Sequence, residues 1–151
     1  MTEFQKTRLR KILVPVNSFN NAAKALAKAI HIAYAYRHDD VSITLLYIST
    51  MDRETLYFYK LRNNRCISVA ETAPYEKICK LMSEIPSDIK AELAVEIGRP
   101  AVCIVNKAKR EGYDVIVMAA SRTAMISAFP GSTSQYVRRH ASCHVVLVPD
   151  E

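Results

Sequence analysis

Apolar residues gather in five short segments, which predict the strands of a sheet. Two of the five, residues 10–16 and 114–119, are apolar runs without polar alternation, and such runs are typical of strands buried on both faces in a parallel sheet. Residues 41–48 and 143–148 are two further predicted strands. The fifth segment, residues 90–97, alternates apolar and polar positions in part, as an outer strand does. Pro15 must lie near the end of the first strand, because it lacks the N–H that a central strand donates.

Between these strands, apolar residues recur at steps of three and four, which predicts helices. The helices are expected at residues 20–37, 72–85, 100–111 and 132–140. The first of them would bury a stripe formed by Ala23, Leu26, Ala27, Ile30, Ala33 and Tyr34. Pro100 suits the first turn of the third helix, and Gly112 suits the left-handed residue that ends it. Ser132 and Gln135 have the spacing of a capping box at the start of the last helix.

Strands and helices therefore alternate along the chain, except for an insertion at residues 50–69. This alternation predicts right-handed crossovers and an α/β fold, a doubly wound parallel sheet with helices on both faces. With 151 residues the chain has the usual size of one domain, so we expect a single domain over residues 1–151. Ligands of such sheets bind at the carboxyl ends of the strands, where the strand order reverses.

The insertion has poor periodicity and mixes aromatic with basic side chains, among them Tyr57, Phe58, Tyr59, Arg62 and Arg65. Aromatic and basic side chains together can bind nucleic acid by stacking. We favour a loop that folds its aromatic side chains back onto the domain, and we expect no nucleic-acid partner.

Composition narrows the choice of function. Only three glycines are present, Gly98, Gly112 and Gly131, and this count excludes the common glycine-rich phosphate loops. The net charge of +6 favours anionic partners such as nucleotides, but the charges are spread along the chain, which favours a solvated basic surface. No apolar run reaches the roughly 18 residues of a membrane span. The first residues also lack the apolar stretch of a secretory signal, so we expect a cytoplasmic protein with no membrane partner.

No pattern in the sequence indicates catalysis or metal binding. The four cysteines are widely spaced, and we interpret them as buried structural thiols rather than zinc or redox ligands. The four histidines have no evident serine or cysteine partner. No carboxylate pair and no metal-ligand spacing stands out, so we expect no catalytic residue and no metal.

The most informative polar segment is Gly-Ser-Thr-Ser at residues 131–134, which opens the last predicted helix. The free N–H groups and the dipole at a helix start attract an anion, and glycine lets a phosphate approach the backbone. The hydroxyls of Ser132 and Thr133 add further donors. Ordinary helix capping by Ser132 explains the same segment equally well.

Several stretches taken together resemble one known family. They are KILVPVN at residues 11–17, DVIVM at 114–118, GSTSQYVRRHA at 131–141 and CHVVLVP at 143–149. In these stretches the chain resembles the universal stress proteins, over nearly its whole length outside the insertion. The resemblance implies a five-stranded sheet of order 3-2-1-4-5 and a dimer. In many members it also implies an ATP site formed by a pattern of three glycines after the fourth strand.

The chain departs from that glycine pattern. Only the last glycine is present, as Gly131. Ala119 replaces the first glycine, and its Cβ would crowd a ribose or phosphate that approaches the backbone. The second glycine has no counterpart. The acidic residue that usually ends the first strand is Asn17.

The resemblance and the strand ends together predict an adenine-nucleotide pocket, with ATP as its ligand. Arg99 and Arg122 offer guanidinium groups that would bind phosphate in place of the missing glycines. The expected lining residues are Pro15, Val16, Asn17, Tyr47, Gly98, Arg99, Met118, Ala119, Ser121, Arg122, Gly131, Ser132 and Thr133.

The preferred hypothesis is a cytoplasmic, homodimeric stress-response or signalling module with this ATP pocket and a signalling partner that the sequence does not identify. One alternative is a family member that binds no nucleotide and acts through protein contacts. A slow nucleotide hydrolase is the least favoured alternative. In the implied order the last strand, from Cys143 to Val148, lies at the sheet edge, and residues 145–148 carry no charge. Because proteins rarely leave such an edge open, this strand is the predicted dimer contact.

Overall fold

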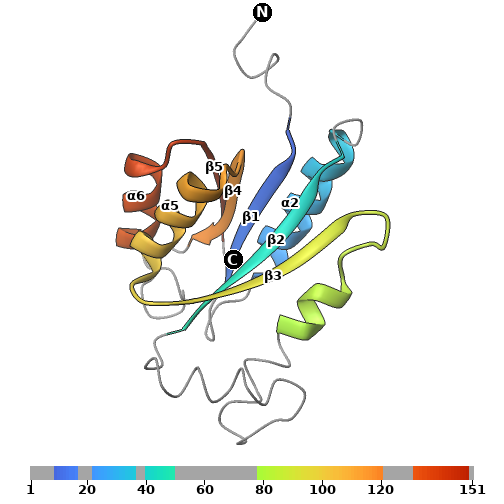
Figure 1. Ribbon diagram of the computed structural model, residues 1–151, viewed down its shortest axis with the longest axis horizontal. Coiled ribbons are helices and arrows are strands. Elements are labelled where there is room, and N and C mark those ends of the chain that lie inside the picture. Colours follow the sequence, from blue (N-terminus) through green and yellow to red (C-terminus); the bar gives the residue numbers. More distant parts are fainter. Residues whose placement is uncertain (1–8, 17–21, 37–39, 50–77, 121–130, 150–151) are drawn as a thin grey trace, which may run out of the picture.

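The computed structural model describes residues 9–16, 22–36, 40–49, 78–120 and 131–149. These residues form a five-stranded, all-parallel sheet in the order β3-β2-β1-β4-β5 (Figure 1). The strands are β1 (Lys11–Val16), β2 (Ser42–Ser49), β3 (Lys90–Ile97), β4 (Val115–Ala120) and β5 (His144–Pro149). The predicted α/β class, the parallel sheet and the strand order implied by the resemblance are confirmed.

Helices cover both faces of the sheet. α2 (Ala23–Ala35) and the helical residues 78–83 pack on one face, and α5 (Pro100–Glu111) and α6 (Gly131–His140) pack on the other. Figure 1 shows α5 and α6 side by side. The crossovers therefore run on one face from β1 to β3 and on the opposite face from β3 to β5, which is the doubly wound arrangement. No helix in the described part of the chain is long and apolar enough to cross a membrane.

The observed element boundaries lie close to the predicted ones. Each strand begins and ends within one residue of its predicted limits. Pro15 is the last residue but one of β1, where its missing N–H disturbs the sheet least. Gly112 ends α5 in the left-handed conformation, with φ of 70°, as predicted. The insertion at 50–69 and residues 72–77 of the second predicted helix lie outside the described residues.

The buried face of α2 differs in part from the predicted stripe. The buried residues are Ala25, Leu26, Ala29 and Ala33. Ala23, Ala27 and Tyr34, which the predicted stripe included, are exposed. Alanines occur on all sides of this helix, so the spacing of apolar residues could not define which side faces the sheet.

The prediction of buried cysteines is wrong for Cys79, which is exposed. Cys79 follows Ile78 in the helical turn, and the buried Ile78 side chain faces the core while Cys79 faces solvent. Cys103 and Cys143 are half-buried. Burial raises the pKa of the Cys143 thiol to about 11, and the Asp114 carboxylate acts in the same direction. Cys143 is therefore a neutral thiol at physiological pH, as expected of a structural cysteine.

Candidate functional site

The carboxyl ends of β1 and β4 are neighbours at the centre of the sheet, and the chain leaves them toward opposite faces. β1 leads toward α2, and β4 leads toward α6. In Figure 1 the strands end, and α5 and α6 begin, at the lower end of the sheet. The strand order reverses between β1 and β4, and doubly wound sheets commonly bind a ligand at such a point.

The candidate residues on the strands themselves are mostly part of the core. Met118 is fully buried on the side of α5 and α6, whereas Val16 and Ala119 are buried on the side of α2. Pro15 is also buried, and Tyr47 is half-buried against the core on the α2 side. The structure does not describe Asn17, Ser121 and Arg122. The strand ends therefore offer a ligand mainly their backbone, with Tyr47 as the most accessible described side chain.

Gly98 directs the chain from the end of β3 into α5. Its φ is 138°, and a Cβ at this position would lie 3.2 Å from Sγ of Cys103. Both the backbone conformation and the close sulfur disfavour any side chain here. The Cys103 thiol donates to the carbonyl oxygen of Ile97 at 3.6 Å, and burial raises the pKa of this thiol, so it stays a donor. Gly98 and Cys103 together fix the angle at which α5 begins.

The start of α5 carries backbone donors that the helix does not use. Arg99 is the N-cap residue, is exposed, and makes no side-chain capping hydrogen bond. Pro100, the first helical residue, has no N–H to satisfy. The first N–H that bonds within the helix is that of Cys103, which donates to the Arg99 carbonyl oxygen at 3.0 Å. The N–H groups of Ala101 and Val102 precede it and have no acceptor among the described residues.

α6 begins beside α5 and closes a pocket with it. Gly131 is its first residue, and Thr133 and Ser134 in its first turn are buried. The pocket between the two helices has a volume of about 360 Å³. It is lined by Arg99, Pro100, Ala101, Val102, Thr133 and Tyr136. We call this hollow the α5–α6 pocket. It brings together Arg99 and Thr133, two of the residues that the sequence predicted for the site.

Ala101, Val102 and Tyr136 line this pocket but were not among the predicted site residues. Tyr136 lies one helical turn after Thr133, and its ring stacks on that of His140 with centroids 4.1 Å apart. A spacing of three residues on a predicted helix would have placed Tyr136 beside Thr133. The sequence could not predict the free N–H groups of Ala101 and Val102. Whether a backbone N–H is free at a helix start depends on whether a side chain caps it, and the residue's own type does not indicate this.

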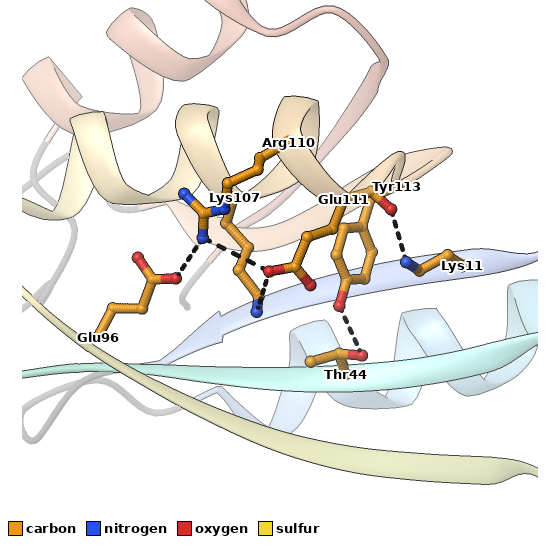
Figure 2. Close-up of polar contacts among 7 residues, drawn as sticks. All are labelled: Lys11, Thr44, Glu96, Lys107, Arg110, Glu111 and Tyr113. Carbon is orange, nitrogen blue, oxygen red and sulfur yellow. Dashed lines mark hydrogen bonds and ion pairs between the residues drawn. The ribbon is translucent and has the colours of Figure 1, made fainter.

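A polar cluster at the other end of α5 holds this helix on the sheet (Figure 2). Lys107 pairs with Glu111 at 2.8 Å, and Arg110 pairs with Glu96 of β3 at 2.9 Å. Lys11 of β1 donates to the carbonyl oxygen of Glu111 at 2.6 Å. The Lys107 hydrogen bond, aided by the charges of Lys107 and Arg110, lowers the pKa of Glu111 although partial burial opposes this. These contacts tie α5 to both β1 and β3, and thereby fix where its first turn lies.

A hydrogen bond between two buried hydroxyls continues this cluster into the core. The Tyr113 hydroxyl donates to the Thr44 hydroxyl at 2.9 Å, and Thr44 is 2% exposed. Nζ of Lys11 lies 4.4 Å from the centre of the Tyr113 ring, within cation–π range. Burial is the main reason that the pKa of Tyr113 is raised, so the phenol keeps its proton and remains a donor. These contacts join α5 to the sheet, which is a structural role.

Metal binding finds no support in the described part of the chain. There, no group of three or more His, Cys, Asp or Glu side chains lies close enough together to hold an ion. The donors that line the α5–α6 pocket are backbone N–H groups, a hydroxyl and a guanidinium, which all bind anions. Fold and site define a doubly wound α/β protein in which the starts of α5 and α6 line one pocket, and the first turn of α5 there has backbone donors with no acceptor among the described residues.

Comparison with known proteins gives the family. The model of the universal stress protein family matches residues 8–149, so the chain belongs to this family and the resemblance seen in the sequence is confirmed. A universal stress protein of Staphylococcus haemolyticus is 26% identical over 147 residues, which cover 94% of this chain and 86% of the relative.

Solved structures agree with this assignment. The universal stress protein UspA from Lactobacillus plantarum has 25% sequence identity and a TM-score of 0.66, with 94% of this chain and 99% of that chain covered. The universal stress protein from Archaeoglobus fulgidus in complex with dAMP has 17% identity and a TM-score of 0.62. That match covers 93% of this chain and 98% of the other, and it shows that the two proteins share a fold.

Proposed function

We propose that this universal stress protein is a cytoplasmic, homodimeric stress-response module that binds an adenine nucleotide, with ATP as the preferred ligand. The observation that carries the nucleotide proposal is Gly131 as the first residue of α6, the helix that follows β4 in the chain. A glycine at a helix start lets a phosphate reach the free N–H groups and the positive end of the helix dipole. The Archaeoglobus fulgidus relative, which has the same fold, was solved with dAMP, and this supports an adenine nucleotide.

In this proposal the phosphates lie at residues 131–133 and the adenosine lies near Pro15, Val16 and Tyr47. The aromatic ring of Tyr47 is half-buried and suited to contact with a base. The Ala119 Cβ was expected to crowd a ribose or phosphate. Ala119 is buried in the core on the α2 side, which makes this crowding less serious. Its methyl group packs there against protein, so it need not occupy the space of a ribose.

The test is nucleotide analysis followed by calorimetry. Purified protein is denatured and its supernatant analysed for adenine nucleotide, and the stripped protein is then titrated with ATP. We expect bound nucleotide or a Kd below millimolar, and we expect Gly131→Val to abolish binding because its side chain fills the place of a phosphate. Gly112→Asn is the matched glycine control, since Gly112 faces open space and asparagine tolerates its left-handed backbone. Absence of binding at millimolar ATP would contradict the nucleotide proposal and favour a module that acts through protein contacts.

The homodimer is proposed to form through β5. This strand is one edge of the sheet, and its four central residues are apolar and half-buried. Pairing with the same strand of a second copy about a two-fold axis would cover this edge. We expect Val146→Lys to give a monomer in sedimentation, whereas Leu93→Lys on the opposite edge strand, β3, leaves the dimer intact. Circular dichroism confirms that each variant is folded, and a folded Val146→Lys dimer would overturn this interface.

A further inference from the structure

The α5–α6 pocket is lined by two residues, Ala101 and Val102, whose N–H groups have no acceptor among the described residues. Ala101 and Val102 present two adjacent N–H groups at the positive end of a 12-residue helix. No acidic side chain occupies the first turn of α5 to offset this charge. A helix start of this kind attracts an anion, but many helix starts are simply hydrated. A second polar group that lines the same pocket and lacks a partner would distinguish a ligand site from a hydrated helix start.

Thr133 supplies such a group from the other helix. Its side chain lines the α5–α6 pocket, yet the residue is only 9% exposed. No described residue forms a hydrogen bond with its hydroxyl. A buried hydroxyl without a partner lowers the stability of the protein, and most such groups in native structures have a partner. A ligand oxygen in this pocket would give the Thr133 hydroxyl its acceptor.

The electrostatics of the pocket favour a negatively charged ligand. Arg99 is exposed at the rim, and its guanidinium can bind two oxygens of a phosphate or carboxylate at once. Glu96, three residues earlier in the chain, is already paired with Arg110 at 2.9 Å, so it does not neutralise Arg99. The apolar side chains of Pro100 and Val102 line the same hollow. They exclude part of the water and strengthen hydrogen bonds to an anion.

We propose that the α5–α6 pocket binds a phosphoryl group, namely the terminal phosphate of the bound nucleotide. This inference rests on the proposed function, because it extends the phosphate chain from the start of α6 to the start of α5. The Ala101 and Val102 amides, the Arg99 guanidinium and the Thr133 hydroxyl all donate to the phosphate oxygens. Arg99 thereby supplies the binding energy that the two missing glycines provide in relatives with the full pattern. A free polyphosphate has the same chemistry, and the experiment separates the two sources.

The experiment compares AMP, ATP and inorganic tripolyphosphate on the wild type, Arg99→Gln, Thr133→Val and Arg138→Gln. Arg138 is the matched control, since it is an exposed arginine of α6 that lines a different hollow with Gln135 and Arg139. Calorimetry gives each Kd. Amide chemical shifts in NMR spectra report whether Ala101 and Val102 change their environment when each ligand is added.

We expect ATP to bind more tightly than AMP to the wild type. Arg99→Gln should weaken ATP binding by about tenfold or more, because it removes a charge-assisted hydrogen bond, and should leave AMP binding unchanged. Thr133→Val should weaken ATP binding by about fivefold and raise Tm by roughly 2 °C, because it removes a buried hydroxyl that has no partner among the described residues. Arg138→Gln should match the wild type. The Ala101 and Val102 amides should shift with ATP and not with AMP.

Other outcomes overturn one proposal or the other. If ATP and AMP bind with equal affinity and Arg99→Gln changes neither, the phosphoryl pocket is refuted while nucleotide binding stands. If neither nucleotide binds, but tripolyphosphate binds the wild type and binds Arg99→Gln more weakly, nucleotide binding is refuted and the pocket binds free polyphosphate. Equal losses in Arg99→Gln and Arg138→Gln would show attraction to net charge and refute the pocket. If no ligand binds, both proposals fail.

Discussion

The two ends of α5 are built in opposite ways. At its C-terminal end Gly112 closes the helix, Lys11 donates to the Glu111 carbonyl oxygen, and Lys107 pairs with Glu111 (Figure 2). At its N-terminal end Arg99 does not cap the helix, and the amides of the first turn have no acceptor among the described residues. One helix thus carries a closed end, which fixes it to the sheet, and an open end, which faces a pocket.

This difference separates stability from binding along a single element. In doubly wound sheets the helices begin at the carboxyl ends of the strands, where ligands bind, and end at the opposite edge. Contacts at the closed end can therefore be optimised for stability without touching a ligand. Changes at the closed end should alter unfolding and leave binding intact, whereas changes at the open end should alter binding.

The largest effect on stability is expected from Asp114→Ala, just beyond the closed end. One carboxylate oxygen of Asp114 accepts from the N–H groups of Arg10 and Lys11, each at 2.9 Å, and so ties α5 to the start of β1. Its loss should lower the free energy of unfolding by about 2 kcal/mol. In a chain of this length that corresponds to a fall in Tm of roughly 4–8 °C, measurable by calorimetry.

The control for this change is Asp114→Asn, which keeps one side-chain oxygen as an acceptor and should cost less than half as much. Nucleotide affinity of the folded protein should be the same in wild type and both variants. Weaker nucleotide binding by folded Asp114→Ala would break the separation between the two ends of α5.

A smaller effect is expected from Tyr113→Phe, which leaves the buried Thr44 hydroxyl without its partner. The expected cost is about 1 kcal/mol of unfolding free energy, the penalty for one unsatisfied buried hydroxyl. The double variant with Thr44→Val removes both hydroxyls and should recover most of this loss. Denaturant unfolding of the two single variants and the double variant measures the coupling. If the losses simply add, the hydrogen bond makes no contribution to stability.

The sequence predicted the closed end of α5 better than the open end. Gly112 has a local signal, because a glycine after the last periodic residue is typical of a left-handed helix terminus. The five strands were also predicted closely, because continuous apolar runs and strand spacing are properties of local sequence. Strand order came only through resemblance to a family, since pairing between distant strands leaves no local pattern.

The pocket at the open end of α5 could not be predicted from the sequence. Arg99 and Thr133 were predicted as site residues, but they are 34 positions apart, and only the packing of α5 against α6 brings them to one pocket. The buried face of α2 was predicted only in part, for a related reason. Alanines on every side of that helix leave its buried face to be decided by the sheet, as the exposure of Ala27 and the burial of Ala29 show.

The smallest expected effect is a dependence of stability on pH at the closed end. The hydrogen bond from Lys107 lowers the pKa of Glu111 below its ordinary value of 4.5. The folded state therefore binds this proton less readily than the unfolded state. The resulting stabilisation is complete above pH 4.5 and is lost as the pH falls through the lowered pKa. Glu111 has a side chain 37% exposed, so solvent screens the pair and its contribution is about 0.3–0.5 kcal/mol.

Chemical unfolding at a series of pH values below neutrality tests this contribution. Glu111→Gln has no charge to lose, so its stability should fall less steeply than that of the wild type as the pH drops below about 4.5. Lys107→Met removes the partner and should flatten the curve in the same way, whereas Arg99→Gln at the open end should leave its slope unchanged. High salt should shrink the difference, because the pair is partly exposed. If Glu111→Gln and the wild type give parallel curves, the Lys107–Glu111 pair does not stabilise the closed end, and the contacts of Lys11, Asp114 and the Arg110–Glu96 pair hold it instead.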